Sequence, residues 1–294
     1  MVQTIPEPIR EAAVAGMFYP GDEDQLAQEV DAMLAAASEV DVFGEVVGLI
    51  CPHAGYSYSG ATAAVGYRSV RGEHYDAVLV MGPSHRESFE GASVFARGGY
   101  ETPLGIVPVD EELAETIVAN EKGDIRADWV AHRVAHVSFR QGLRGEHAIE
   151  VQLPFLQRAV VDLKIVPMVV GHYDSAMCQR IGDAIVDAIG ERRVLIVVSS
   201  DLYHGEDDAA CRVSDTQTLG AIETRNFEAF AQGVNGRTLQ ACGSGAILIF
   251  MQMAERLGVN RAQVIASTNS NEVMGRKGGY VVGYGAVAWT RGDR

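Results

Sequence analysis

The sequence is poor in basic charge, in aromatic residues and in cysteine. Lys and Arg number 24 against 39 Asp and Glu, so the formal net charge is −15. A field of that sign repels phosphate backbones and anionic lipids, which argues against nucleic acid and membranes as partners. The four cysteines include no CxxC pair, and they are too scattered for a disulfide framework. No run of about 18 apolar residues is present to form a membrane span.

Further absences narrow the function. Residues 1–22 carry acids and proline where a secretory signal needs a basic start and an apolar core, which favours a cytoplasmic protein. Neither GxGxxG nor GxxxxGKS/T occurs as a usable fingerprint, so no nucleotide site is expected. His132 and His136 have the spacing of a zinc-protease HExxH helix but lack its glutamate. We therefore interpret them as surface residues.

What the sequence does contain is short apolar runs separated by amphipathic segments. The predicted strands are Val46–Ile50, Ala77–Met81, Ile165–Val170, Val194–Val198 and Tyr280–Trp289. The predicted helices are Asp24–Ala37, Asp110–Asn120, Ala176–Ile189, Asp215–Gln232 and Gly245–Leu257. The first four runs are nearly continuously apolar, as strands covered by helices on both faces should be. The alternation predicts an α/β fold, a three-layer αβα sandwich around a central, largely parallel or mixed β-sheet. No linker marks a boundary, so residues 1–294 are expected to form a single domain.

Four of the eight histidines follow predicted strands: His53, His85, His172 and His204. The carboxyl ends of strands in an open α/β sheet line the crevice where ligands bind, so these side chains are expected to lie near one another. Imidazole is the commonest transition-metal ligand in proteins. We therefore interpret His53 and His85 as a metal or catalytic pair. Either one alone could equally be a turn histidine satisfied by backbone atoms.

Two further features near strand and helix ends carry chemistry. Cys242 precedes an apolar helix, whose N-terminus would stabilise a thiolate as ligand or nucleophile. The alternative is a small residue chosen for packing beside glycines. Asp201 and His204 are three residues apart, so a helical turn would put carboxylate and imidazole on one face. That pairing suits His204 as a general acid–base and Asp201 as the group that orients it, whereas the alternative is a capping aspartate with an exposed histidine.

The predicted substrate pocket includes two tyrosines and one His–Glu pair. Tyr56 and Tyr58 follow His53 closely, and they could shape a pocket wall or simply pack on the sheet. His147 precedes Glu150 by three residues, the same spacing as in the Asp201–His204 pair. From the residues alone, the alternative for His147 is a solvated helix start. We assign to this pocket Tyr56, Tyr58, His147 and Glu150.

Five segments, spread almost end to end, carry a resemblance to a known family. They are Ala13–Pro20, Pro52–Gly60, Gly82–His85, Glu146–Phe155 and Ser199–His204. Each is a weak signal alone, but the ordered set is specific. Together they resemble the Memo family, whose prokaryotic members are called AmmeMemoRadiSam system protein B.

The resemblance implies a fold like that of class III extradiol dioxygenases of the LigB type, which open catechol rings with non-haem Fe(II). Carried over by position, it implies a metal site of His53, His85 and Cys242. His204 falls on the acid–base position, with Asp201 beside it. The dioxygenases use a carboxylate where the Memo-type site has a cysteine, and a softer thiolate lets Cu and Zn compete better with Fe(II). The resemblance to iron enzymes makes Fe(II) the preferred cofactor, and the cysteine keeps Cu or Zn as alternatives.

Three functions stay open at this point. The first is a mononuclear metal protein, preferably iron, with redox or dioxygenase-like chemistry on an unknown small molecule. The second is a non-redox hydrolase that uses Cys242 activated by His204, or a zinc hydroxide. The third is a non-catalytic module that binds a peptide or partner protein, since eukaryotic members of the family are linked to receptor signalling and cell motility. The resemblance also implies a radical-SAM protein as a partner.

Overall fold

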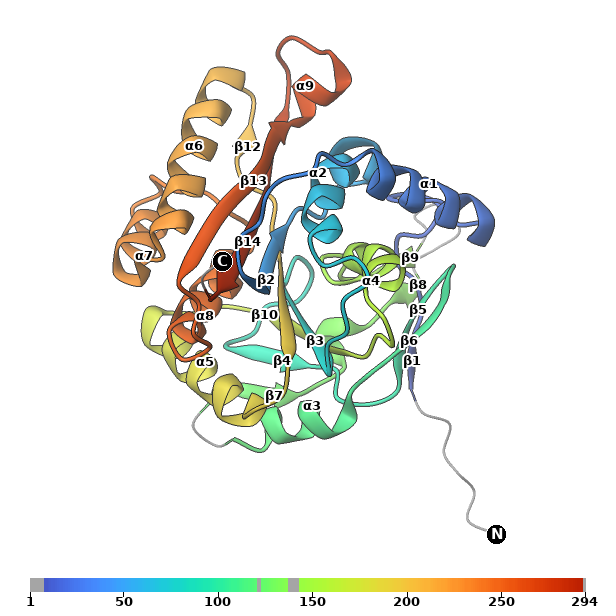
Figure 1. Ribbon diagram of the computed structural model, residues 1–294, viewed down its shortest axis with the longest axis vertical. Coiled ribbons are helices and arrows are strands. Elements are labelled where there is room, and N and C mark those ends of the chain that lie inside the picture. The colour runs from blue at the N-terminus through green and yellow to red at the C-terminus, as the bar shows by residue number, and fades with distance from the viewer. Residues whose placement is uncertain (1–7, 121–122, 137–142, 293–294) are drawn as a thin grey trace.

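A large mixed β-sheet organises the computed structural model, which describes residues 8–120, 123–136 and 143–292. The sheet strands are β2 (Glu45–Cys51), β3 (Ala77–Pro83), β4 (Ala92–Val94), β7 (Ile125–Ala127), β10 (Ile165–Val170), β11 (Val194–Ser199), β12 (His204–Gly205), β13 (Arg261–Asn269) and β14 (Val281–Arg291). Within the described residues their order is β12–β14–β2–β11–β3–β10–β4–β7, with β13 paired to β14 (Figure 1).

The centre of the sheet is parallel. Strands β2, β11, β3 and β10 are neighbours that run in the same direction, and their residues are almost entirely buried. The register pairs Ser199 with Cys51 and Val170 with Pro83. These four strands therefore end at the same edge of the sheet, which is where a ligand site is expected in this class of fold. The neighbouring β14 and β4 run antiparallel to them, so the sheet is mixed.

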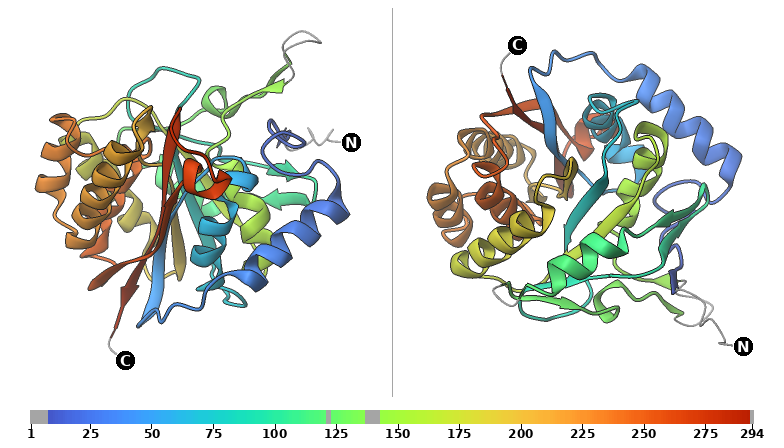
Figure 2. Two further views of the ribbon diagram at one scale, coloured as in Figure 1. Left: turned by 90° about the horizontal axis from the view of Figure 1, so that it is seen from above. Right: turned by 60° about the horizontal axis from the view of Figure 1, so that its bottom comes forward.

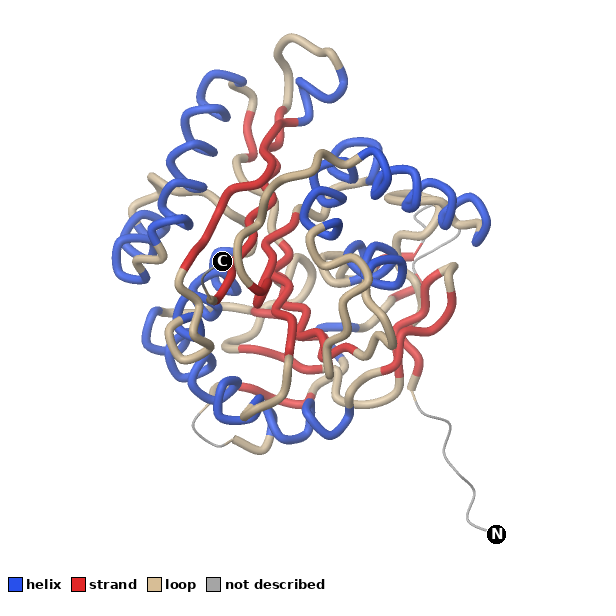
Figure 3. The backbone as a smooth tube through the Cα atoms, viewed as in Figure 1, coloured by secondary structure: helices blue, strands red, loops and turns tan. Residues whose placement is uncertain are grey.

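Helices cover both faces of this sheet (Figures 1 and 2). One face carries α1 (Glu23–Ala36), α2 (Tyr56–Arg68) and α4 (Leu153–Ala159). The other carries α5 (Ser175–Ile189), α6 (Asp208–Thr224), α7 (Phe227–Asn235) and α8 (Ser244–Ala254). In Figure 3 the strands lie between the two groups of helices. The predicted three-layer αβα architecture is confirmed.

Smaller elements complete the chain at the edges. The remaining helices are α3 (Glu111–Val118) beside β7 and the short α9 (Ser270–Met274) between β13 and β14. A second sheet consists of β1 (Ile9–Arg10), β5 (Gly99–Thr102) and β6 (Gly105–Pro108). Strands β8 (Ala135–His136) and β9 (Leu143–Arg144) form a separate two-stranded sheet. Short 3-10 helices span Val130–His132 and Glu150–Gln152. No helix among the described residues is both long enough and apolar enough to cross a membrane.

One predicted helix, Asp215–Gln232, is two helices in the structure. Helix α6 ends at Thr224 because Arg225 adopts a left-handed conformation with φ of 55°. Asn226 then caps the start of α7, and its side chain accepts a hydrogen bond from the Ala229 amide at 2.9 Å. An asparagine in this role satisfies an amide that the new helix would leave unpaired.

Candidate metal centre

The ends of three neighbouring strands bring together the residues that the sequence predicted for a metal or catalytic site. Strand β2 leads into His53, β3 leads into His85, and β11, which lies between them, leads into Asp201. The ring centroids of His53 and His85 are 5.2 Å apart, with the rings nearly perpendicular. The prediction that these two histidines lie close together is therefore confirmed.

His53 is buried, and the hydroxyl of Ser199 fixes its orientation. The Nδ1 atom of His53 lies 2.8 Å from Ser199 Oγ. That hydroxyl donates to the Ala148 carbonyl at 2.6 Å and accepts from Gln152 Nε2 at 2.7 Å. Tyr67 donates to Gln152 Oε1 at 2.7 Å, which sets the orientation of the amide. Because a hydroxyl has one hydrogen, His53 Nδ1 must be a donor, and the lone pair of the neutral ring lies on Nε2.

His85 is oriented in the same manner by Glu146. The buried Glu146 carboxylate lies 2.9 Å from His85 Nδ1 and accepts from the His147 and Ala148 amides at 2.8 and 2.9 Å. Burial alone would raise the pKa of Glu146, but the hydrogen bond and charge of His85, the charge of His147 and the Ala148 amide hold that pKa at about 2. An ionised carboxylate only accepts, so His85 Nδ1 donates and the lone pair lies on Nε2.

His147 is the third histidine of the cluster. Its ring stacks on that of His85 at 4.7 Å between centroids, and the ring of His53 stands edge-on to it at 5.4 Å. One ring nitrogen from each of the three histidines lies within 4.8 Å of those from the other two. Among the described residues, no group forms a hydrogen bond with the buried His147 Nδ1; Glu146 Oε1 is 3.7 Å away. The orphaned nitrogen is what a site built for a ligand would contain.

Burial favours the neutral form of two of these histidines, His53 and His147. Burial, followed by repulsion from His85, lowers the pKa of His53 to about 3. Burial, followed by repulsion from His53, lowers the pKa of His147 to about 4. Neutral imidazole is the form that binds a metal ion, so the donor set fits a transition metal without further rearrangement of charge.

Cys242 brings a thiol to the same place, on the turn that precedes α8. Its Sγ lies 3.3 Å from His53 Nε2 and accepts from the Asp201 amide at 3.1 Å. Gly243 lets the turn lie against β11, since a Cβ there would stand 2.6 Å from the Ser199 carbonyl oxygen. Burial raises the pKa of the Cys242 thiol. The sequence predicted that the helix N-terminus would stabilise the Cys242 thiolate, but desolvation of the buried sulfur outweighs that effect and favours the thiol.

Asp201 and His204 reach the same edge, but no hydrogen bond of the described residues joins them. Asp201 Oδ1 accepts from the His53 amide at 2.8 Å, whereas the exposed His204 donates from Nδ1 to the Leu202 carbonyl at 3.0 Å. The chain after β11 is not helical, so the three-residue spacing does not set the two side chains on one face. Burial raises the pKa of Asp201, although the His53 amide and the charge of His204 act to lower it. Asp201 therefore supports the His53 backbone instead of orienting His204.

The two tyrosines assigned to the pocket differ in their surroundings. Tyr56 is buried, donates to the Val151 carbonyl at 2.8 Å and packs its ring on Phe155 at 4.9 Å. Its contacts are therefore those of a core residue. Tyr58, half-buried in the first turn of α2, keeps its assignment to the pocket as a prediction.

Glu150 holds the N-terminal segment in place and does not face a pocket. Its completely buried carboxylate accepts from the amides of Ala13 and Val14 at 2.8 and 2.9 Å and from the Tyr19 hydroxyl at 2.6 Å. It also pairs with the guanidinium of Arg10. These donors occupy both oxygens, so the assignment of Glu150 to a substrate pocket is corrected. A buried carboxylate needs such partners wherever it lies.

A small cavity of about 130 Å³ adjoins Cys242. It lies between the ends of β3 and β10 and the start of α8, and its wall includes Glu87, His172 and Tyr173. His172 is exposed there and is held by Ser88 Oγ, 2.8 Å from its Nε2. A space of this size beside the thiol would admit only a small molecule or a few waters.

His132, interpreted above as a surface residue, is completely buried. Its Nε2 donates to the Ser93 carbonyl at 3.0 Å, and its Nδ1 accepts from the Tyr100 hydroxyl. Its carbonyl accepts from Arg10 Nε at 3.0 Å. The sequence interpretation was wrong because the 3-10 turn directs the ring inward. The side chain of His136 lies outside the described residues.

Sequence reasoning also missed the groups that orient the ligands. Ser199, Gln152 and Glu146 all lie inside the motifs quoted above, but nothing in their spacing says which side chains they meet. The adjacency of Glu146 and His147 is the one local signal, since a carboxylate next to an imidazole is common in metal sites.

Comparisons with known proteins show which family the chain resembles over most of its length. The family model described as "Memo-like protein" matches residues 10–288. A "MEMO1 family protein" of Nitrosopumilus maritimus is 31% identical over 284 residues, covering 95% of this chain and 98% of the relative. Another from Methanosarcina mazei is 33% identical over 282 residues, with the same coverage of both chains.

A solved structure also shares the fold. It is that of an uncharacterized protein from Escherichia coli K12, with a TM-score of 0.50 and 13% sequence identity, and it covers 81% of this chain and 99% of the other. At that identity the likeness shows the fold alone. The relation to extradiol dioxygenases stays a prediction. Since the family model spans most of the sequence and relatives at 31 and 33% identity align over 95% of it, the chain belongs to the Memo family.

Proposed function

We propose that the protein binds one metal ion through His53, His85 and His147, with the thiol of Cys242 as a further ligand, and that the ion serves redox chemistry on a small molecule. One observation carries the proposal. Nitrogens of three histidines converge within 4.8 Å, beside a sulfur that lies 3.3 Å from one of them. Among the described residues the buried His147 Nδ1 has no hydrogen-bond partner, which is costly unless a ligand supplies one.

The residues around the ligands have separable tasks. Ser199 accepts a hydrogen bond from His53 Nδ1, and Glu146 accepts one from His85 Nδ1. The Nε2 atoms of both histidines are thereby directed inward. Support of this kind keeps ligands in one orientation and raises their basicity. A metal ion in this position would supply Lewis acidity and, for iron or copper, electron transfer.

His204 is proposed as the proton carrier. Because its Nδ1 donates to the Leu202 carbonyl, the lone pair of the neutral ring lies on Nε2, on an exposed side chain at the rim of the site. That nitrogen can take a proton from a bound substrate and return it to a product.

Iron(II) is the proposed ion, on the strength of the resemblance to non-haem iron enzymes, and Cu and Zn are the alternatives. The thiol of Cys242 is what keeps the alternatives open, since soft sulfur favours Cu and Zn over Fe(II). The test is elemental analysis with EPR spectroscopy on anaerobically purified protein. Variants His53→Ala, His147→Ala and Cys242→Ala are compared with the wild type and with His172→Ala, a histidine on the same sheet edge outside the cluster.

The expected result is stoichiometric iron in the wild type and in His172→Ala, and its loss in His53→Ala and His147→Ala. Undiminished metal in both cluster variants would overturn the site. Zinc in place of a redox metal would overturn the redox chemistry and leave a zinc hydroxide as the better assignment. Absence of any metal after reconstitution with Fe, Cu and Zn would overturn the proposal as a whole.

A further inference from the structure

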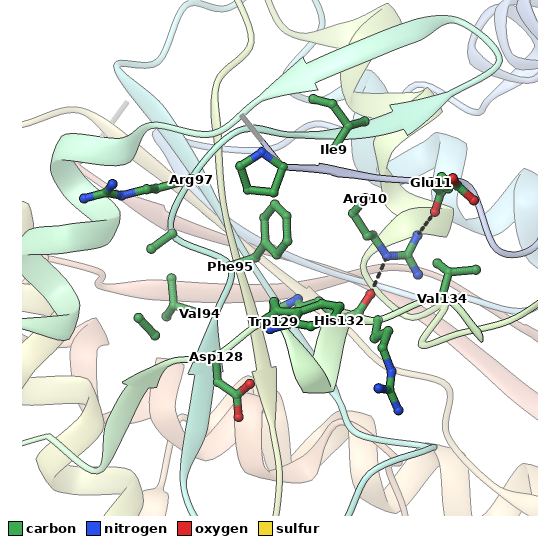
Figure 4. A pocket seen from close by; sticks show the side chains of 14 residues that line it. Ile9, Arg10, Glu11, Val94, Phe95, Arg97, Asp128, Trp129, His132 and Val134 are labelled. Carbon is green, nitrogen blue, oxygen red and sulfur yellow. Dashed lines mark hydrogen bonds between the residues drawn. The ribbon is translucent and has the colours of Figure 1, made fainter. Parts of the chain in front are cut away.

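A second cavity, which shares no lining residue with the metal centre, lies where β4 and β7 end beside β1 (Figure 4). Its volume is about 600 Å³, within the range of sites that hold drug-sized ligands. Three segments far apart in the chain form it: residues 8–11, 94–97 and 127–134. We call it the β1 groove.

The β1 groove is lined mainly by apolar side chains, several of which reach solvent. Phe95, Val94 and Val134 form part of its wall, and Ile9 and Trp129 are 42% and 60% exposed. Scattered exposed apolar residues are ordinary, whereas a cluster of them around a concave surface is typical of a binding site. The groove is therefore built to cover the apolar part of a ligand.

The charges that line the groove are mostly paired. Asp128 accepts from the Val130 amide at 2.7 Å and lies 3.2 Å from Arg126. Arg97 pairs with Glu115 at 2.6 Å. Each of these charges has a partner, so none of them is available to a ligand without breaking an existing pair.

Two more charges lie at the Arg10 side of the groove. Arg10 pairs with the buried Glu150, and Arg10 also donates to the carbonyl of Glu11 at 3.0 Å (Figure 4). Arg10 and Glu11 therefore both have partners already, so an anionic group of a ligand is expected at the remaining lining cation, Arg133.

Arg133 is the exception among the lining arginines. Its guanidinium rests over the Trp129 ring at 5.9 Å from the centroid, and no carboxylate of the described residues pairs with it. A guanidinium held on an aromatic ring keeps its fork of donors free for a carboxylate. This cation is notable in a chain whose formal charge is −15, because most of the arginines that the structure describes are paired with acids.

We propose that the β1 groove binds an apolar carboxylate, a monoanion whose hydrocarbon body packs on Phe95 and Trp129 while its carboxylate pairs with Arg133. The proposal does not depend on the metal centre. Apolar burial supplies affinity in proportion to the covered area, and the charged pair at the rim selects an acid over its neutral analogue.

Decanoate and decanol, kept below the concentration at which they aggregate, are the probes. Trp129 is exposed and Trp289 is completely buried, so a shift of tryptophan emission on binding reports the groove, and Trp129→Phe should abolish it. Arg133→Gln should weaken decanoate binding roughly tenfold and leave decanol unchanged. Arg276→Gln, an exposed arginine after α9, is the matched control and should change neither.

A second variant protects the test. Ala127 is an exposed residue of β7 that lines the groove, so Ala127→Phe should fill it without disturbing the core and weaken both probes. Equal decanoate affinity in the wild type and Arg133→Gln would overturn the assignment of the carboxylate to Arg133. Undiminished binding in Ala127→Phe, or no change in Trp129 emission, would overturn the groove as the site.

Discussion

At the scale of single residues, the metal centre depends on a serine that no metal would touch. Ser199 Oγ accepts a hydrogen bond from His53 Nδ1 and so directs Nε2 of that ring inward. In Ser199→Ala the ring can rotate or change tautomer, and metal affinity should fall by about 10- to 100-fold. Competition with a chelator of known affinity measures the change.

The control for this variant is Ser88→Ala, since Ser88 holds the exposed His172 with the same 2.8 Å contact. It should leave the metal affinity unchanged. Equal affinities in Ser199→Ala and the wild type would show that the ring is held by packing alone. Circular dichroism separates a loss of ligand geometry from a loss of fold.

A second residue, His132, should give the metal-free protein part of its pH dependence. Burial lowers the pKa of His132 to about 4 from the ordinary 6.5. The unfolded chain therefore takes up this proton as the pH falls below about 6.5, while the folded protein resists until about pH 4. The contribution of His132 to the free energy of unfolding is fully present above about pH 6.5, and at pH 5 it is smaller by about 2 kcal/mol.

In His132→Gln this contribution is absent, so the difference in unfolding free energy between about pH 7.5 and pH 5 should be smaller by that amount. Urea unfolding of metal-free protein at both pH values measures it. His74→Gln, at an exposed histidine, is the control. Identical pH dependence in His132→Gln and the wild type would contradict the argument.

At the scale of elements, the site needs β3 and the segment before α4 to lie unusually close. A Cβ on Gly82 would stand 2.8 Å from the Ala148 Cβ, closer than two such carbons pack. Gly82→Ala should therefore push residues 146–148 outward, destabilise the protein by about 1–3 kcal/mol and weaken metal binding. Thermal unfolding and metal titration measure the two effects.

The sharpest control for Gly82→Ala is the exchange variant Gly82→Ala/Ala148→Gly, which moves the methyl group from one side of the contact to the other. It should recover much of both losses. Gly220→Ala, in the middle of α6 with open space around it, should be neutral or slightly stabilising. A double variant as impaired as Gly82→Ala would mean that the contact is not what places His147.

The same closeness explains what the sequence could and could not predict. His53 and His85 were predicted together because the carboxyl ends of buried parallel strands share an edge, whatever the details of packing. His147 comes from a loop, and its place beside them depends on the fit between Gly82 and Ala148, which no local pattern reveals. Strand β13 was missed because it is half-exposed and polar, without the continuous apolar run of a central strand.

At the scale of the whole molecule, the N-terminal segment is fastened to the segment that supplies Glu146 and His147. Arg10 donates to the carbonyl of Glu146 and pairs with Glu150, 140 residues away in the chain. Both partners of the pair are buried. A contact between residues so far apart in the chain stabilises the tertiary structure and not a local element of secondary structure.

Removing both members of this pair should cost less than the sum of removing each one alone. Glu150→Gln leaves a buried guanidinium unpaired and should lower the free energy of unfolding by about 3–5 kcal/mol. Arg10→Met should cost less, since the Glu150 carboxylate keeps three donors from Ala13, Val14 and Tyr19. The double variant should lose less than the sum of the two, because the unpaired charge is gone.

The exposed Arg97–Glu115 pair is the control, and Glu115→Gln should change stability by less than about 1 kcal/mol. Urea unfolding gives the three values, and strictly additive losses would show that the pair does not act as a unit.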